Sequence, residues 1–340
     1  MAEEPQNGPV KSHWKKISLV GAGVLVFLFM VIFIANYRFP SFFDPPSPPN
    51  NQNIPGWVFT TTIIDLGDQM FSNWLPNDII WPTAFMDNRP NYQLGELKAL
   101  TYTVLSLKEN LSRLRSSDAM DNNCSEAYSL LNNDPLKWIF PSAESRFEKA
   151  IVYLQDYRQK LEANQARFSP RADNLSELLR YYVSLLGTLN AALANAPGGL
   201  RLKQVSRLTP PPPAPAPANV TAINATNATA PSPPAAPLEL EKATPYSEVD
   251  DHFYEAQGAA YVLREMMAAI RVDFREILEV KKATEIVDDI ILTLDQSQFE
   301  PIIVLNGDIG SITANHSMEL HSILENSRQK INNLMEMISQ

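Results

Sequence analysis

Cysteine is nearly absent from this sequence, in which Cys124 is the only one. An internal disulfide is therefore excluded, and 340 residues are enough to build a core that is stable without one. Because a redox role would need a partner thiol, Cys124 is predicted to be a buried, small apolar residue.

Glycine is scarce as well, with 12 in the chain. The phosphate-binding patterns G-x-x-x-x-G-K and G-x-G-x-x-G do not occur, and neither does the G-x-S-x-G elbow of hydrolases. The sequence therefore predicts no catalytic residue and no cofactor, and we expect a protein that is not an enzyme.

Histidine occurs only four times, which limits metal chemistry. The strongest candidate ligands stand together near the start of a predicted helix: Asp250, Asp251, His252 and Glu255. Carboxylates and imidazole can bind a transition metal, but a site needs three or four converging ligands, and acidic residues favour helix N-termini in any case. No metal site is predicted.

Two further histidines, His316 and His321, are five residues apart, which is a poor spacing for one helix face. A hydrolase would need His252 or His316 to converge with carboxylates in a cleft. This is the least favoured of the functions considered.

Basic residues are outnumbered, with 28 Lys and Arg against 38 Asp and Glu. Four of the basic and two of the acidic residues lie before Phe39, so the rest of the chain carries a net charge of about −12, which repels nucleic acid. Nucleic acid is therefore not an expected partner.

Charge is missing altogether from Ile17 to Tyr37. A helix of this length spans about 31 Å, which matches a bilayer core of about 30 Å. The run is too long for a signal peptide, and no small-residue cleavage site follows it. Lys11, Lys15 and Lys16 precede it, so the positive-inside rule predicts a cytoplasmic tail at 1–16 and a single membrane helix at 17–37.

Two segments are rich in proline. Residues 38–55 hold six prolines and predict a stiff stalk that lifts the following domain off the bilayer. Residues 209–237 hold ten prolines and no charge, and predict a disordered insert. We expect the sections on either side of the insert, 56–208 and 238–340, to pack as one domain, with two separate units as the alternative.

Both sections show apolar residues at steps of three and four, which predicts amphipathic helices. The expected helices cover 63–71, 94–115, 122–133, 142–168, 174–196, 246–300 and 313–338. The span 246–300 is either one helix or two that meet near Lys281 and Lys282. The predicted fold is mostly α: a single N-terminal transmembrane helix and an extracytoplasmic multi-helix bundle with long heptad-patterned helices.

Aromatic residues crowd the start of the first helical section. They are Trp57, Phe59, Phe71, Trp74, Trp81, Phe85 and Tyr92. They either cap the helical core or line a groove for a partner or ligand.

Four segments, Asn73–Leu97, Trp138–Tyr157, Arg171–Leu179 and Leu305–Ser317, resemble bacterial domain-of-unknown-function family 2333. The resemblance covers nearly the whole chain apart from the tail and the insert. It implies one N-terminal membrane helix in the inner membrane of a Gram-negative bacterium, with the C-terminal domain in the periplasm. The family has no established activity, so no site residue carries over.

We therefore expect a non-enzymatic envelope interaction or scaffold protein, whose partners are the bilayer, through residues 17–37, and other envelope proteins. The alternative is a periplasmic module that binds a small molecule or lipid through the aromatic segment. The membrane helix has no G-x-x-x-G motif, so the sequence neither predicts nor excludes a homo-oligomer.

Overall fold

The computed structural model describes residues 10–36, 39–49, 52–77, 87–113, 118–196, 202–203, 239–240, 245, 248–301, 304–307 and 314–340. The described chain is mostly helical, which confirms the predicted mostly α class. Its α-helices are α1 (Val10–Asn36), α2 (Trp57–Phe71), α3 (Asn88–Ser106), α4 (Asn122–Leu131), α5 (Ala143–Glu162), α6 (Ala172–Ala194), α7 (Val249–Asp273), α8 (Arg275–Val280), α9 (Thr284–Asp295) and α10 (His316–Ser339).

Three minor elements accompany these helices. A π-helical turn, η2 (Leu107–Leu111), follows α3. The strands β1 (Leu202–Lys203) and β2 (Glu239–Leu240) pair antiparallel, with Leu202 opposite Leu240. The insert predicted at 209–237 lies outside the described residues, but the chain on its two sides meets at this pair of strands.

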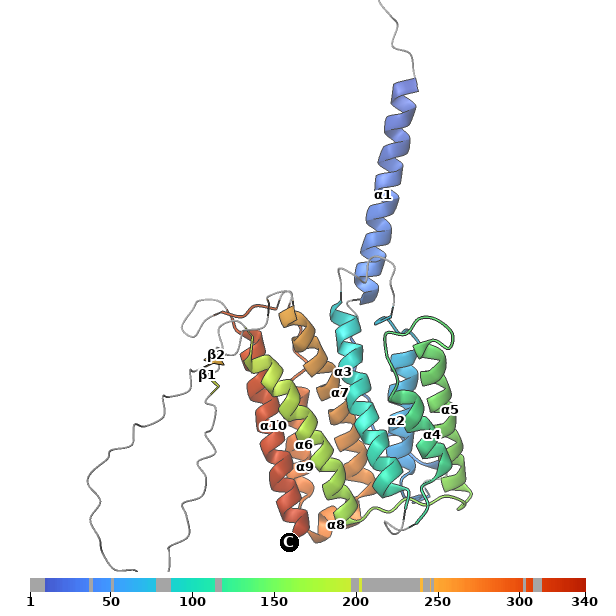
Figure 1. Ribbon diagram of the computed structural model, residues 1–340, viewed down its shortest axis with the longest axis vertical. Coiled ribbons are helices and arrows are strands. Elements are labelled where there is room, and N and C mark those ends of the chain that lie inside the picture. Colours follow the sequence, from blue (N-terminus) through green and yellow to red (C-terminus); the bar gives the residue numbers. More distant parts are fainter. Residues whose placement is uncertain are drawn as a thin grey trace, which may run out of the picture.

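The helices from α2 to α10 form one bundle, from which α1 projects at one end (Figure 1). α3 packs on α7, α6 on α10, and α5 on both α2 and α4. One continuous core joins side chains from both sides of the insert, for example Leu100 and Leu186 with Leu263 and Leu324. Each long helix of the bundle buries the apolar stripe seen in its sequence, because water leaves those faces only when helices pack against one another.

α3 and α7 cross at two glycines. A Cβ at Gly95 would lie 1.9 Å from the carbonyl oxygen of Glu255, and one at Gly258 would lie 1.9 Å from that of Tyr92. Only glycine permits so close an approach of two helix backbones. This crossing therefore sets how α3 and α7 sit against each other.

Side-chain caps explain several helix starts. The Asp121 carboxylate accepts from the backbone N–H of Asn123, Ser142 caps α5, and Asn315 accepts from the N–H of Met318 at 3.0 Å. These contacts satisfy N–H groups that have no partner within the helix.

The predicted helix 246–300 is divided more than expected. The break near Lys282 is confirmed, and this residue has a left-handed backbone with φ of 54°. A second break at Phe274 separates α7 from α8. The periodicity could not show it, because Phe274 is itself a buried residue of the stripe.

α2 starts at Trp57 and not at Ile63, so the first prediction was too short. Residues 60–62 are three threonines, which disfavour helices in isolation. They are buried here, and packing outweighs propensity because every residue from Trp57 to Ile64 is buried.

In the part of the chain that the structure describes, no helix is both long enough and apolar enough to cross a membrane. The span predicted at residues 17–37 therefore stays a prediction.

Candidate functional site

The segment that follows α1 lies against the bundle. We call residues 39–49 the strap. The Phe39 ring stacks on Tyr254 of α7, with 5.5 Å between centroids, and Phe42 stacks on Tyr261 two helical turns further along, at 5.7 Å. The strap therefore follows the α7 surface from its first turns toward its middle.

Charged side chains on the next turn of α7 also hold the strap. The backbone N–H of Phe43 donates to Glu265 at 3.3 Å, and the Arg264 guanidinium lies 4.3 Å from the centre of the Phe42 ring. Arg264 also donates to Asp295 of α9 at 2.8 Å. Burial raises the pKa of Glu265 to about 7, against the opposing effect of Arg264.

This contact differs from the stalk predicted at 38–55. The proline-rich segment does not lift the bundle away from α1; its aromatic side chains pack on the core. Farther along, the backbone N–H of Gly56 donates to Asp273 at the other end of α7, at 3.1 Å. The segment thus connects α1 to the far end of the bundle, and α2 runs back from there. Prolines explain its extended form but not what it touches.

A buried polar cluster lies below the strap. Arg89 and Glu96 of α3 face each other with 3.4 Å between charged atoms, and both are nearly free of solvent. Tyr92 lies between them in sequence, packs 4.9 Å from Phe39, and donates to Gln298 at 2.8 Å. Burial raises the pKa of Glu96 to about 7, although Arg89 lowers it.

This polar cluster is closed to solvent and joins neighbouring elements. Arg89, Tyr92, Glu96 and Tyr261 are buried beneath the strap, so a substrate would have no direct access to them. A buried ion pair of this kind adds little net stability, because the cost of removing both charges from water offsets their attraction. The arrangement is suited to holding α3, α7 and the strap in one geometry.

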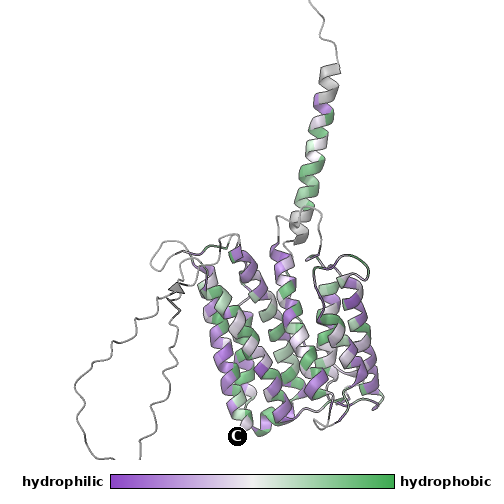
Figure 2. Ribbon diagram, viewed as in Figure 1, coloured by the Kyte–Doolittle hydropathy of each residue, from purple (hydrophilic) through white to green (hydrophobic). Residues whose placement is uncertain are grey.

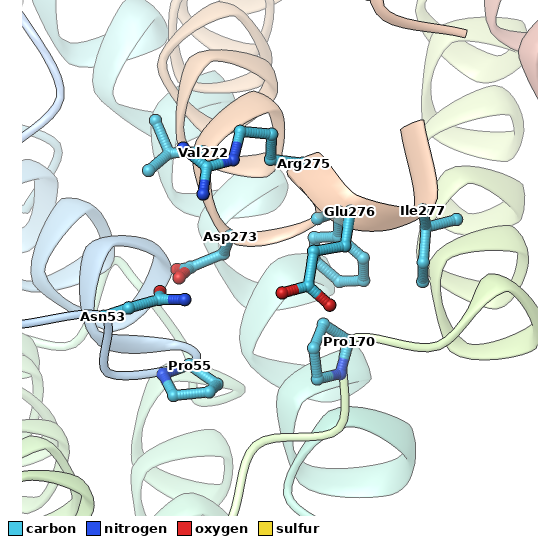
Figure 3. Close-up of a pocket in the computed structure, with 9 residues that line it drawn as sticks. Asn53, Pro55, Pro170, Val272, Asp273, Arg275, Glu276 and Ile277 are labelled. Carbon is cyan, nitrogen blue, oxygen red and sulfur yellow. The ribbon is translucent and has the colours of Figure 1, made fainter. Parts of the chain in front are cut away.

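A small, open pocket of about 90 Å³ lies at the opposite end of the bundle. It is lined by Asn53 and Pro55 before α2, Pro170 before α6, and residues 272–277. Figure 3 shows Asp273 directed toward Asn53, and Glu276 directed toward Pro170. Two carboxylates in one pocket can act as a general acid and a general base. Whether they do so depends on whether each carboxylate is free to exchange a proton with a substrate.

Asp273 is already engaged. Its two oxygens accept from the backbone N–H groups of Gly56, at 3.1 Å, and Phe59, at 2.6 Å, at the start of α2. Burial raises its pKa to about 6, and these two hydrogen bonds oppose the rise. Asp273 therefore caps α2 from another helix, and this pocket is better explained as a structural junction than as a reaction site.

The acidic group at the start of α7 is engaged with α3. Asp251 accepts from Asn91 of α3 at 2.6 Å, and Glu255 pairs with Lys98 of α3. His252 and Asp250 are partly buried. Over the described ranges, no three or more His, Cys, Asp or Glu side chains gather closely enough to hold a metal ion. Two of the candidate ligands thus join α7 to α3.

The two other histidines considered as candidates, His316 and His321, lie on α10. The His316 ring accepts through Nδ1 from the backbone N–H of Leu305 at 3.0 Å, and it lies 6.3 Å from the Phe299 ring. His321 is partly buried one turn further into α10. His316 therefore helps to hold the loop before α10.

The aromatic segment contributes to the core. Of its seven aromatic residues, those that the structure describes are all buried: Trp57, Phe59, Phe71, Trp74 and Tyr92. The Trp74 indole donates to the carbonyl of Pro135 at 3.1 Å. The other two, Trp81 and Phe85, lie outside the described residues. The interpretation as a core cap fits these five, and they do not line a groove.

Sequence reasoning missed the strap contacts. The signal was the cluster of phenylalanines at 39, 42 and 43 among the prolines. Side chains so apolar are out of place in a solvated spacer. Cys124 was predicted correctly, since it is fully buried and unpaired.

Comparisons with known proteins add only a family. No curated protein and no solved structure matches the chain. A family model matches residues 43–340, from the middle of the strap to the end of α10. The chain belongs to the family described as an uncharacterized protein conserved in bacteria (DUF2333).

Proposed function

We propose that this protein is a single-pass inner-membrane protein that acts by binding other envelope proteins. Residues 17–37 cross the bilayer, 1–16 lie in the cytoplasm, and the bundle lies in the periplasm. The observation that carries this proposal is the exposure of α1, whose large apolar side chains from Ile17 to Val31 are 44–77% accessible.

An isolated apolar helix in water is unfavourable for two reasons. Helices without tertiary packing are marginally stable, and each large apolar side chain left exposed forgoes about 1.5–3 kcal/mol. A bilayer removes both difficulties. The described side chains of α1 end at Val31, and the sequence continues with Ile, Phe, Ile and Ala at 32–35, which extends the apolar run.

The strap supports a positioning role. Since Phe39 and Phe42 dock on the bundle within a few residues of α1, the bundle is held close to the end of the anchor. The buried state of Arg89 and Glu96 and the capping role of Asp273 favour binding over catalysis. The ligand-binding alternative is less well supported, because the described residues of the aromatic segment are buried in the core and line no groove.

A reporter that is active only outside the cytoplasm, fused after Gln340, tests the topology. We expect activity in the membrane fraction of the full chain, and none when residues 17–37 are deleted. Reporter activity in the cytoplasm would contradict the localisation.

Crosslinking in intact cells, followed by purification of the full chain, tests the interaction role. We expect reproducible envelope-protein partners that disappear when the anchor is deleted. If the purified chain instead turned over envelope polymers or esters, the non-enzymatic role would be wrong.

A further inference from the structure

The loop between α4 and α5 exposes an unusual concentration of apolar side chains. Phe140 is 97% accessible, Trp138 62%, Ile139 59% and Leu136 55%. Single exposed apolar residues are ordinary, but four within five positions are not. We call residues 136–140 the apolar loop.

The apolar loop has a fixed base. The carbonyl of Lys137 accepts from the side chain of Asn77 at 3.2 Å and from the backbone N–H of Ala143 at 2.8 Å. The Trp74 indole holds the carbonyl of Pro135 just before it. The exposure of the tip therefore results from a defined loop conformation.

The loop lies at the end of the bundle from which α1 projects (Figure 1). A series of contacts leads there from the strap: Phe39 packs on Tyr92 of α3, and the adjacent Gln93 donates to the carbonyl of Asn73, at 2.7 Å. The segment after Asn73 then holds the base of the loop through Asn77. Figure 2 shows the same end, with the apolar helix α1 rising from it.

We propose that the apolar loop is a second membrane contact, which enters the interface of the bilayer that α1 spans. This inference rests on the proposed function, since it needs α1 in the bilayer. Trp138 suits the headgroup region, where tryptophan is enriched, and Phe140 and Ile139 suit the acyl boundary beneath it. Lys137 can remain among the phosphates.

Lipid fits this loop better than a protein partner does. The most exposed side chain, Phe140, projects from a tip, and a tip enters a fluid interface without needing a matching pocket. The strap leaves only a few residues between α1 and the bundle, so this end cannot lie far from the bilayer surface. With two contacts, the bundle has a fixed orientation on the membrane.

The test uses the full chain, with Cys124 replaced by alanine, in phosphatidylcholine vesicles. An environment-sensitive fluorophore is attached in turn at Phe140→Cys, at Val24→Cys in α1, and at Val280→Cys. Val280 is the matched control, because it is 79% exposed and lies in α8 at the opposite end of the bundle. Ile139→Cys provides a second loop position, and neither loop substitution touches the core.

We expect blue-shifted emission at 140 and 139, with quenching by spin-labelled lipid several-fold greater than at 280. If position 24 is quenched while 140 and 139 behave like 280, the apolar loop proposal is wrong and the anchor stands. A blue shift at 140 without lipid quenching would also overturn it, in favour of a protein contact. If position 24 is not quenched, the anchor itself fails, and the loop proposal fails with it.

Discussion

At the scale of single residues, two glycines and one aspartate have more structural consequence than any of the residues first considered as ligands. Gly95 and Gly258 let two backbones meet, and Asp273 caps a helix that is distant in sequence. Each acts through contacts between segments far apart in the chain, so its role depends on the fold.

Replacing Gly95 or Gly258 by alanine should destabilise the bundle by about 3 kcal/mol, because the new methyl group meets a backbone carbonyl that cannot move cheaply. Denaturant unfolding of the full chain in mild detergent measures this. Gly187 in α6 is the control, since a Cβ there meets nothing within 4 Å. Alanine at 187 should stabilise by up to about 1 kcal/mol. Equal effects at 95 and 187 would contradict the close crossing.

Asp273→Ala should cost about 1–3 kcal/mol, because it leaves the N–H groups of Gly56 and Phe59 without an acceptor. Asp273→Asn keeps one acceptor oxygen and should cost less. Hydrogen exchange across α2 provides the local readout: the first turn should exchange faster in the alanine variant, with the asparagine variant between it and the parent.

At the scale of elements, the strap is the feature that changes how the molecule is understood. Its prolines predict an extended chain, and the structure has one, but the aromatic side chains decide that it docks. An extended segment of the same composition without those rings would be a spacer.

Phe42→Ala should loosen the strap by about 1–2 kcal/mol, since a half-buried ring and its contacts with Tyr261 and Arg264 are lost. Limited proteolysis of the full chain should then cut within residues 39–49 faster than in the parent. The control is Phe140→Ala, which removes an equally large ring from an exposed site. Unchanged cleavage in the Phe42 variant would mean that the strap is held by something else.

Replacing the proline-rich insert 209–237 with a short glycine–serine turn should leave the unfolding free energy within about 0.5 kcal/mol of the parent, because closure entropy changes slowly with length. The flanking strands β1 and β2 are already paired, so a short turn can join them. Thermal unfolding checks this. A large loss of stability would assign the insert a structural role.

At the scale of the whole molecule, buried acids give the stability an unusual pH dependence. Burial raises the pKa of Glu96, Asp251 and Glu265 to about 7, and that of Asp273 to about 6. Such groups bind protons more tightly when folded, so the unfolding free energy falls as the pH rises through this range. Glu325, with a pKa lowered to about 2, acts oppositely, but its contribution is complete above about pH 4.5.

The full chain should therefore be more stable at pH 5 than at pH 7.5, as measured by denaturant unfolding at both values. Glu265→Gln should reduce this difference, because it removes one of the groups responsible. The same substitution at exposed Glu319 of α10 should leave it unchanged. If the unfolding free energy instead increased from pH 5 to 7.5, ionisation of the buried acids would not destabilise the folded protein, and this explanation would be wrong.

The sequence by itself determined the helical class, most helix positions and the burial of Cys124. These follow from apolar spacing, caps and proline, which are local and act within a few residues. Helix ends were less certain where packing competed with propensity, as at the three threonines in the first two turns of α2.

Only the tertiary structure decided how the elements meet. It brought α1 and the apolar loop to one end and docked the strap on α7. It also engaged Asp251 and Glu255 in contacts with α3, and His316 in a contact with the loop before α10. These outcomes depend on which side chains become neighbours across long stretches of chain. Periodicity in one segment holds no information on the partner of its buried face, and the prolines of the strap predict only that the chain is extended.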